Sequence, residues 1–244
     1  MVFSKIHAAL EFRPVRSLAQ HRLFPSTHRT KPHMRLISHN FQDGQAIPGE
    51  FAFAVPDATA HIALSSNRNP HLAWSDIPEG TQSFVIICHD PDVPSKGDDV
   101  NQEGREVPAE LPRIDFFHWL LLDIPASIKQ IEAGSHSNGV TPRGKPGPNA
   151  ADGLRHGTND YTVWFAGDAQ MKGEYYGYDG PCPPWNDTLV HRYIFTVYAL
   201  ATPALAVDAP LTGVSVRAAL ATAPVLGQAS LTGLYRLNLS VPLD

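Results

Sequence analysis

The sequence predicts a mainly β protein, in which many short strands are joined by turns and followed by one or two C-terminal helices. The chain of 244 residues contains 22 Pro and 18 Gly, which favour turns over long helices. Segments of alternating or continuous apolar residues outnumber segments with helical spacing. At 43% hydrophobic and 18% charged residues, the chain can bury a substantial core.

The first part of the chain predicts three strands. Residues 51–54 and 61–64 are short strand candidates, and residues 84–88 form a continuous apolar run that is typical of a buried strand. This run leads into His89-Asp-Pro-Asp-Val-Pro94, where two carboxylates and two prolines follow the expected end of the strand. We therefore expect a rigid, negatively charged corner there.

Two long loops and two further strands are expected in the middle of the chain. Residues 95–115 are acidic and polar and predict a long loop, which leads to a strong strand candidate at residues 116–124. Residues 134–160 are rich in Gly and Pro and predict a second long loop, of the kind that is either functional or disordered. Residues 161–166 are the next strand candidate.

The C-terminal part predicts a strand, a helix and a last strand. Residues 191–200 alternate with period two and are rich in aromatic and β-branched residues, which favours a strand. Residues 214–226 have apolar residues at helical spacing, and Gly227 would end that helix. Residues 234–239 alternate again and predict a final strand.

Two of the expected strands carry histidines. Successive side chains on a strand point to opposite faces, so His118 shares a face with apolar residues such as Leu120, as core histidines usually do. In the later strand, His191 and Tyr193 share one face, whereas Arg192 lies on the other. This placement favours a paired structural charge for Arg192.

The net charge of −5 is unevenly distributed along the chain. Residues 1–33 carry six Lys or Arg and one Glu, a net +5, so residues 34–244 carry −10. The basic segment has the composition of a mitochondrial transit peptide, but we favour a disordered extension that precedes a single domain at residues 34–244. An acidic domain argues against nucleic-acid binding.

The sequence also lacks the usual signals for membrane insertion or secretion. No apolar run approaches the ~18 residues of a membrane span, and the N-terminus lacks the apolar stretch of a secretory signal. Two cysteines do not make a disulfide framework. We therefore expect a cytoplasmic protein.

Most common catalytic motifs are absent from the sequence. There is no phosphate-binding P-loop, no Gly-x-Ser-x-Gly elbow, no His-Glu-x-x-His and no paired Cys-x-x-Cys. Cys182 lies between prolines, which suits a structural turn better than a nucleophile with His191 as its base. A metal set of two histidines and one carboxylate, drawn from His118, His191 and Asp90 or Asp92, stays open.

We favour an anion pocket built from these residues. A phosphate or carboxylate group needs hydrogen-bond donors between rigid walls, and imidazole, a Tyr hydroxyl and backbone amides can supply them. An unperturbed imidazole titrates near pH ~6.5, and a neighbouring carboxylate favours its charged form. Asp90 or Asp92 beside His118 would thus help it to meet an anion, or to transfer a proton in an enzyme.

Four short motifs stand out by their order along the chain. They are Asp90-Pro-Asp-Val-Pro94, Phe117-His-Trp119, Gly180-Pro-Cys-Pro-Pro184 and His191-Arg-Tyr193. This order resembles that of the phosphatidylethanolamine-binding protein family, and over residues 34–240 the chain most resembles its bacterial, Raf kinase inhibitor-like branch. The resemblance implies a β-sandwich with a large antiparallel central sheet, a smaller second sheet and flanking helices.

The resemblance also implies a small pocket for phosphate-like or carboxylate-like groups, with no required metal or organic cofactor. By motif match, the residues that would line it are Asp90, Asp92, Pro94, Phe116, His118, Pro183, Pro184, His191 and Tyr193. The segment before His118 is longer than in the animal members, so the 95–115 loop would lie beside the pocket mouth. Bacterial members are often dimers, which makes a homodimer one expected state.

Three functions fit these features. The first, which we favour, is a non-enzymatic binding protein for a small anionic or phosphorylated ligand, which could regulate a protein partner. The second is an enzyme that uses the Asp and His side chains for acid–base or metal-assisted chemistry. The third is a protein-interaction regulator whose pocket is vestigial.

Overall fold

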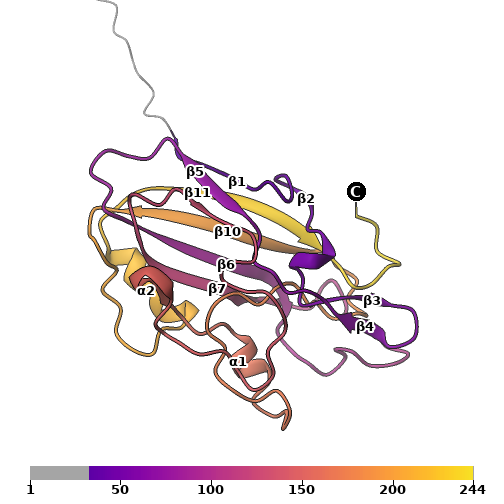
Figure 1. Cartoon of the computed structure of the whole chain (residues 1–244). Coiled ribbons are helices and arrows are strands. Elements are labelled where there is room, and N and C mark those ends of the chain that lie inside the picture. Colours follow the sequence, from indigo (N-terminus) through magenta and orange to yellow (C-terminus); the bar gives the residue numbers. More distant parts are fainter. Residues whose placement is uncertain (1–32, 244) are drawn as a thin grey trace, which may run out of the picture. The chain divides into compact units, whose positions relative to one another are not determined.

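The computed structural model describes residues 33–243, in which strands dominate over helices (Figure 1). The largest sheet has six strands in the order β2-β11-β10-β6-β7-β9, and all neighbours are antiparallel except β11 and β2. Its strands are β2 (Gln45–Ala46), β6 (Ser83–Pro94), β7 (Arg113–Pro125), β9 (Arg155–His156), β10 (His191–Leu200) and β11 (Val225–Tyr235). The predicted large central sheet is confirmed.

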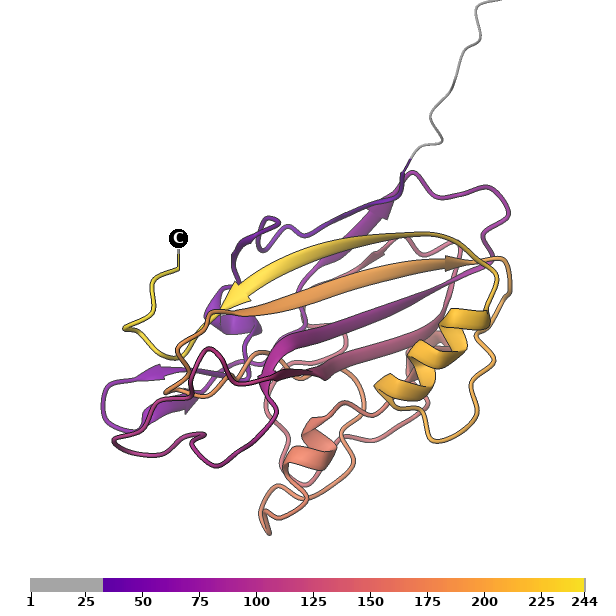
Figure 2. The same cartoon turned by 180° about the vertical axis from the view of Figure 1, so that it is seen from behind.

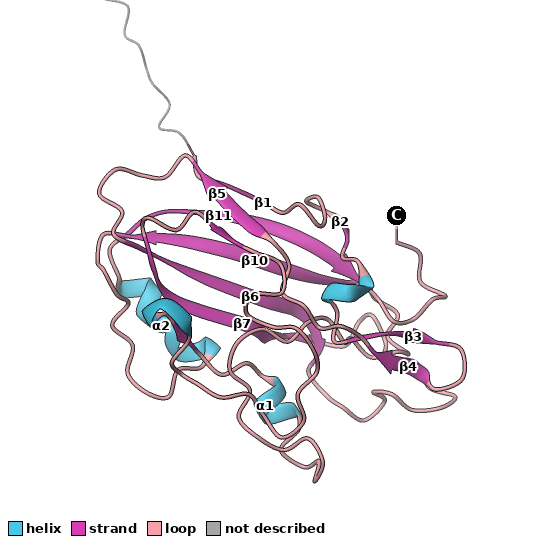
Figure 3. Ribbon diagram, viewed as in Figure 1, coloured by secondary structure: helices cyan, strands magenta, loops and turns pink. Residues whose placement is uncertain are grey.

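Smaller elements surround this sheet (Figure 3). Three short strands form a second antiparallel sheet in the order β1-β5-β8, and β3 and β4 form a hairpin. The elements are β1 (Arg35–Ile37), β3 (Ala54–Asp57), β4 (His61–Leu64), β5 (Leu72–Ser75), β8 (Gln130–Ile131), the helices α1 (Tyr161–Trp164) and α2 (Gly213–Thr222), and 3-10 turns at Gly49–Phe51 and Ala151–Gly153. The predicted smaller second sheet is therefore confirmed as well.

The central sheet lies between two apolar layers. On one face, Phe84 and Ile86 of β6 pack in the same cluster as Trp74 of the second sheet. On the other face, Val85 of β6 packs in a cluster with Val216 of α2, and Figures 1 and 2 show α2 close to β7. Because both faces of β6 are covered, its apolar run is continuous, as predicted for a buried strand.

The expected corner at residues 89–94 is wrong, because β6 continues to Pro94. Its register with β7 shifts between Cys88 and His89 and again between Asp90 and Val93. Such β-bulges bend a strand and accommodate prolines, which have no N–H to donate, while the strand stays paired in the sheet. The carboxyl group of Asp90 is therefore held within a strand, where Asp90 pairs with Phe116 of β7.

The predicted strand at residues 191–200 coincides with β10. His191, Tyr193 and Phe195 are buried along one face, whereas Arg192 on the other face is exposed. The alternation of side chains was therefore predicted correctly, and it places an imidazole and a phenol at the N-terminal end of β10.

The predicted strand at residues 161–166 is wrong, because this segment begins with the short helix α1. Asn159 Oδ1 accepts a hydrogen bond from the amide of Tyr161 (3.1 Å), and the amides of Val163 and Trp164 donate to the Asp160 carbonyl. Asn and Asp favour turns of this kind. Val163 and Trp164 are exposed, so the apolar residues here do not form the buried face of a strand.

The C-terminal helix is shorter than predicted, and a long strand follows it. α2 ends at Thr222, two residues before Pro224, because a residue that precedes proline disfavours helical geometry. Gly227 lies inside β11, where a Cβ atom would come within 2.9 Å of Pro78. The predicted strand at residues 234–239 is also wrong, because β11 ends at Tyr235.

The two predicted long loops are only partly irregular. β7 begins at Arg113, so the first loop ends earlier than expected, and Asn186 Nδ2 donates to the carbonyl groups of Asp99 (2.8 Å) and Arg105 (3.0 Å) within it. The second loop contains β9 and a 3-10 turn. The expected basic extension lies outside the described residues, except for His33. No helix within residues 33–243 has the length and apolar character to cross a membrane.

Candidate functional site

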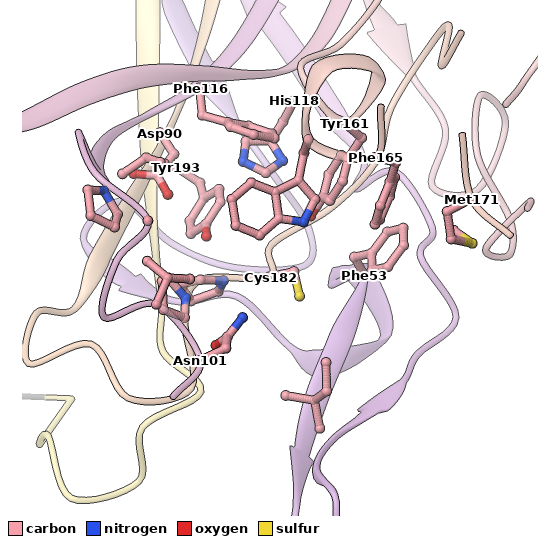
Figure 4. Close-up of a pocket in the computed structure, with 18 of the residues that line it drawn as sticks. Phe53, Asp90, Asn101, Phe116, His118, Tyr161, Phe165, Met171, Cys182 and Tyr193 are labelled. Atoms are coloured by element: carbon pink, nitrogen blue, oxygen red, sulfur yellow. The ribbon is translucent and has the colours of Figure 1, made fainter. Parts of the chain in front are cut away.

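A cavity of about 400 Å³ opens at one end of the central sheet (Figure 4). Because β6 runs antiparallel to β7 and β10, the C-terminal end of β6 meets the N-terminal ends of β7 and β10 there. β6 contributes Asp90 and Pro94, β7 contributes Phe116 and His118, and β10 contributes Tyr193. The β3–β4 hairpin, the loop before β7, the α1 region and the Pro-rich loop before β10 form the other walls.

A β-bulge directs His118 towards the cavity. The pairing of β7 with β6 skips His118, which is the extra residue between Phe117 and Trp119. Leu120 packs on the α2 side of the sheet, whereas His118 lines the cavity on the opposite side. The predicted common face of His118 and Leu120 is therefore wrong, since the bulge interrupts the alternation of side chains.

Two loop aspartates bind the backbone of this bulge. The amide of Phe117 donates to Asp160 Oδ2 (2.7 Å), and the amide of Asp160 donates to the Phe117 carbonyl (2.9 Å). The amide of Asp179 donates to the His118 carbonyl (3.1 Å). These contacts replace the strand neighbour that β7 lacks at this point, so the bulge is fixed in place.

The His118 imidazole is buried, with 3% of the residue exposed, and it has one hydrogen bond. Its Nδ1 lies 2.7 Å from the Asp179 carbonyl oxygen, which can only accept, so Nδ1 carries the proton. Burial lowers the pKa of His118, although Asp90 opposes this effect. At neutral pH the ring is therefore neutral, and Nε2 offers a lone pair.

Asp179 positions this imidazole and is itself fully buried. Its carboxylate accepts hydrogen bonds from Asn67 Nδ2 (2.7 Å) and Asn159 Nδ2 (2.8 Å), and it forms an ion pair with Lys145 (2.8 Å). No pattern in the sequence pointed to Asp179, because its partners lie far from it along the chain. The fold alone reveals that this residue orients His118.

His191 lies behind the cavity, in a chain of charged groups. Its Nδ1 is 2.7 Å from Asp90 Oδ2 and its Nε2 is 3.0 Å from Asp187 Oδ2, while Arg113 forms an ion pair with Asp187. A neutral imidazole could donate to only one of these carboxylates. Burial would lower the pKa of His191, but the two carboxylates outweigh it and raise the pKa to about 9. His191 is therefore a charged structural residue.

The two carboxylates of the first motif have different partners. Asp90 Oδ1 accepts from the amide of Asp92 (2.8 Å), and its Oδ2 faces His191. Asp92 binds Arg192 through two side-chain hydrogen bonds, to Nε (2.9 Å) and Nη2 (2.7 Å). The predicted structural pairing of Arg192 is thus present, and only Asp90 of the two carboxylates faces the cavity.

Tyr193 supplies a polar group without a partner. It is 1% exposed, and its hydroxyl oxygen has no partner in hydrogen-bonding geometry within the described residues, although burial and the nearby Asp90 raise its pKa. Figure 4 shows its ring beside the carboxyl group of Asp90, below Phe116 and His118. Leaving a buried hydroxyl without a partner costs about 1–3 kcal/mol, which a ligand atom at this position would recover.

Apolar side chains line most of the remaining wall. The sequence did not single these residues out as pocket residues, and they come from the segment of the β3–β4 hairpin, the end of β6, the loop before β7, the α1 region and the Pro-rich loop. They are Phe53, Ile62, Leu64, Val93, Val100, Tyr161, Trp164, Phe165, Met171 and Cys182. Their only signal in the sequence is apolar character, which core residues share, so a sequence argument could not separate them from the core.

The structure therefore gathers seven of the nine expected pocket residues at one cavity and places two behind it. Those that line the cavity are Asp90, Pro94, Phe116, His118, Pro183, Pro184 and Tyr193. Asp92 and His191 do not line it, because each is bound to charged neighbours. Ligand binding by the seven lining residues stays a prediction.

The geometry disfavours both Cys182 as a nucleophile and a metal ion shared by His118 and His191. Burial raises the pKa of the Cys182 thiol to about 12, so the thiolate that a nucleophile requires is rare at neutral pH. Both nitrogens of His191 face carboxylates, which leaves it no lone pair for a metal shared with His118. Within residues 33–243, no three His, Cys, Asp or Glu side chains are grouped to hold a metal ion.

The chain as a whole has counterparts among known proteins. The family model described as "Phosphatidylethanolamine-binding protein" matches residues 37–236. The chain belongs to this family. It is 31% identical over 183 residues to the UPF0098 protein YbhB of Escherichia coli (strain K12), which covers 75% of this chain and 88% of that protein.

Further relatives and solved structures agree with this assignment. A UPF0098 protein of Methanothermobacter thermautotrophicus is 30% identical over 203 residues, 83% of this chain and 99% of that protein. The crystal structure of E. coli YbcL, described as a new member of the mammalian PEBP family, shares the fold at a TM-score of 0.57, with 24% identity over 84% of this chain and 99% of that one.

Proposed function

We propose that this protein binds small molecules through a phosphate or carboxylate head group that lies against Asp90, His118 and Tyr193. Membership of a binding-protein family supports the binding role. The observation that carries the proposal is the buried Tyr193 hydroxyl, which has no hydrogen-bond partner among the described residues and lines a cavity together with the Nε2 side of His118. A buried polar atom of this kind favours a ligand oxygen as its partner.

The charges at this end of the cavity restrict the form of the head group. Asp90 and the neutral His118 Nε2 can only accept hydrogen bonds, whereas the Tyr193 hydroxyl can donate one. None of the residues that line the cavity is Lys or Arg. An anion therefore binds together with a proton, either as a monoanionic phosphate that donates to an acceptor or by charging His118.

Binding without turnover is part of the proposal. Asp90 already accepts hydrogen bonds from His191 and from the Asp92 amide, so both of its carboxylate oxygens have structural partners. His118 is then the one side chain at the polar end that can exchange a proton with the ligand near neutral pH. A reaction that uses both a general acid and a general base would need a second such group with a different pKa.

A thermal-shift titration with inorganic phosphate tests the proposal on wild type and Tyr193→Phe. At a hundred times its dissociation constant, phosphate should stabilise wild type by ~2.7 kcal/mol, a shift of several degrees at roughly 2–4 °C per kcal/mol. Tyr193→Phe should raise Kd about three- to tenfold, because it removes one hydrogen bond to the ligand. Its melting temperature without phosphate should not fall and should rise by a few degrees, since the variant removes a buried hydroxyl that has no partner within residues 33–243.

Tyr178→Phe provides the matched control. The Tyr178 hydroxyl is equally buried but donates to the Phe51 carbonyl (2.6 Å), and it does not line the cavity. Without phosphate, this variant should be less stable than wild type by about 1 kcal/mol of unfolding free energy. Phosphate should raise its melting temperature by as much as it raises that of wild type. If Tyr193→Phe keeps the same Kd as wild type, the head-group site is elsewhere.

A further inference from the structure

The cavity divides into a polar and an apolar half. In Figure 4, Asp90, His118 and Tyr193 gather on one side, while Phe165, Phe53 below it and the more distant Met171 lie on the other side. The polar half has the room and the groups for one head group. The apolar half is continuous with it, so a single ligand can reach both.

The size of the cavity exceeds that of a head group. At roughly 30 Å³ for each heavy atom, the share that a water molecule takes in the liquid, about 400 Å³ holds on the order of a dozen atoms. A phosphate group supplies about five of these. Room for about six to eight further atoms remains against apolar walls.

We propose that the apolar half binds one short alkyl or aryl substituent, so that the preferred ligand is a single-chain acid such as a phosphate monoester with six to eight carbon atoms. This inference rests on the proposed function of the polar half, and it adds the ligand class.

The walls of the apolar half combine fixed rings with an adaptable side chain. The Tyr161 ring stacks on the rings of Phe53 and Phe165, with distances between ring centroids of 4.8 and 5.4 Å. These rings therefore hold one another in position. Met171 is partly buried at the far side, and a flexible thioether can adjust to substituents of different shape. Leu64 and Trp164, which also line the cavity, are 65% and 53% exposed. A bound substituent would cover part of this apolar surface.

The test is a series of n-alkyl phosphates, from methyl to dodecyl, measured by calorimetry below their critical micelle concentrations. Affinity should increase between about two- and fourfold for each added methylene up to hexyl or octyl, and then level off or fall. A Kd that is independent of chain length, or that keeps improving through dodecyl, would overturn the inference.

Two substitutions that each introduce a carboxylate, one inside the cavity and one outside it, test whether the apolar half causes the dependence of affinity on chain length. Met171→Glu should reduce the ratio of octyl to methyl phosphate affinity at least tenfold, because it places a carboxylate in the apolar half. Val163→Glu is the control, since Val163 is 75% exposed and does not line the cavity, and it should leave this ratio unchanged. An equal ratio in Met171→Glu and wild type would also contradict the inference.

Failure of the inference can be distinguished from failure of the proposed function. If methyl phosphate binds and depends on Tyr193 while the chain-length series is flat, the head-group site stands and the apolar half does not hold a substituent. If hexanol binds as well as hexyl phosphate, the apolar half is occupied but the head-group proposal fails.

Discussion

His118 and His191 lie on the two strands that flank β6, and both are buried against Asp90, yet their environments differ. His191 has a carboxylate at each nitrogen, at 2.7 and 3.0 Å, and its pKa is raised to about 9. His118 has a backbone carbonyl at one nitrogen and the cavity at the other, and burial lowers its pKa. One imidazole is therefore charged and enclosed, and the other is neutral and open to a ligand.

This difference teaches that burial alone does not decide the charge of a histidine. Burial disfavours the charged form of both rings, and only two carboxylates in direct contact reverse the effect. The His191 ring, with two partners, stabilises the fold, whereas the His118 ring, with one partner, has its Nε2 free to bind a ligand. Substitutions at the two positions should therefore have different consequences.

The largest expected effect is the loss of stability in His191→Gln. Glutamine cannot supply a positive charge between Asp90 and Asp187, and removing one partner from buried charges costs roughly 3–5 kcal/mol. The melting temperature should fall by roughly 10 °C, at 2–4 °C per kcal/mol. His118→Gln, which breaks a single hydrogen bond, should lose about 1 kcal/mol. Urea unfolding measures both, and equal losses would contradict the comparison.

The pH dependence of stability should also follow His191. Its folded pKa of about 9 is above the ordinary value of 6.5, so its stabilising contribution is complete below pH 6.5 and disappears as the pH rises through 9. Wild type should lose stability in this window, and His191→Gln should lose much less. Denaturation midpoints at pH 6, 8 and 9.5 measure this difference. A wild-type midpoint that does not fall towards pH 9.5 would argue that His191 is neutral.

An intermediate effect is expected for phosphate binding as a function of pH. Because the pKa of His118 is lowered, binding of the anion requires a proton that the free site does not hold at neutral pH. Affinity should therefore fall about tenfold for each pH unit between pH 7 and 9, which is the slope for one proton taken up. Calorimetry in buffers of different ionisation enthalpy should detect this proton, and a Kd that is constant over the range would contradict it.

The smallest effect is expected at Arg192, which is a third charged group at the same end of the sheet. The side chain of Arg192 is 54% exposed in its ion pair with Asp92. Exposed ion pairs contribute about 0–1 kcal/mol to the free energy of unfolding. Arg192→Gln should therefore lower the melting temperature by no more than a few degrees and leave phosphate binding unchanged. A loss as large as that of His191→Gln would show that exposure is a poor guide to the role of these pairs.

Part of the fold could be predicted from the sequence, where one segment carries its own signal. The alternation of residues 191–200 and the apolar run at residues 84–88 each predicted a strand, since burial on one or both faces leaves a periodic pattern. Val163 and Trp164 are apolar without being buried, and the Asn159-Asp160 turn starts a helix there. The run from α2 into β11 was misjudged because Gly227, expected to end a helix, makes room for Pro78 inside a strand.

The sequence by itself determined the strands of the central sheet that carry the site, and four motifs that resemble one family. Only the tertiary structure decided which of their residues face the cavity. The β-bulge at His118 depends on Asp160 and Asp179, and the charge of His191 depends on Asp90 and Asp187. The physical reason is that a pKa or a side-chain direction is set by neighbours in space, and these neighbours come from segments that are distant along the chain.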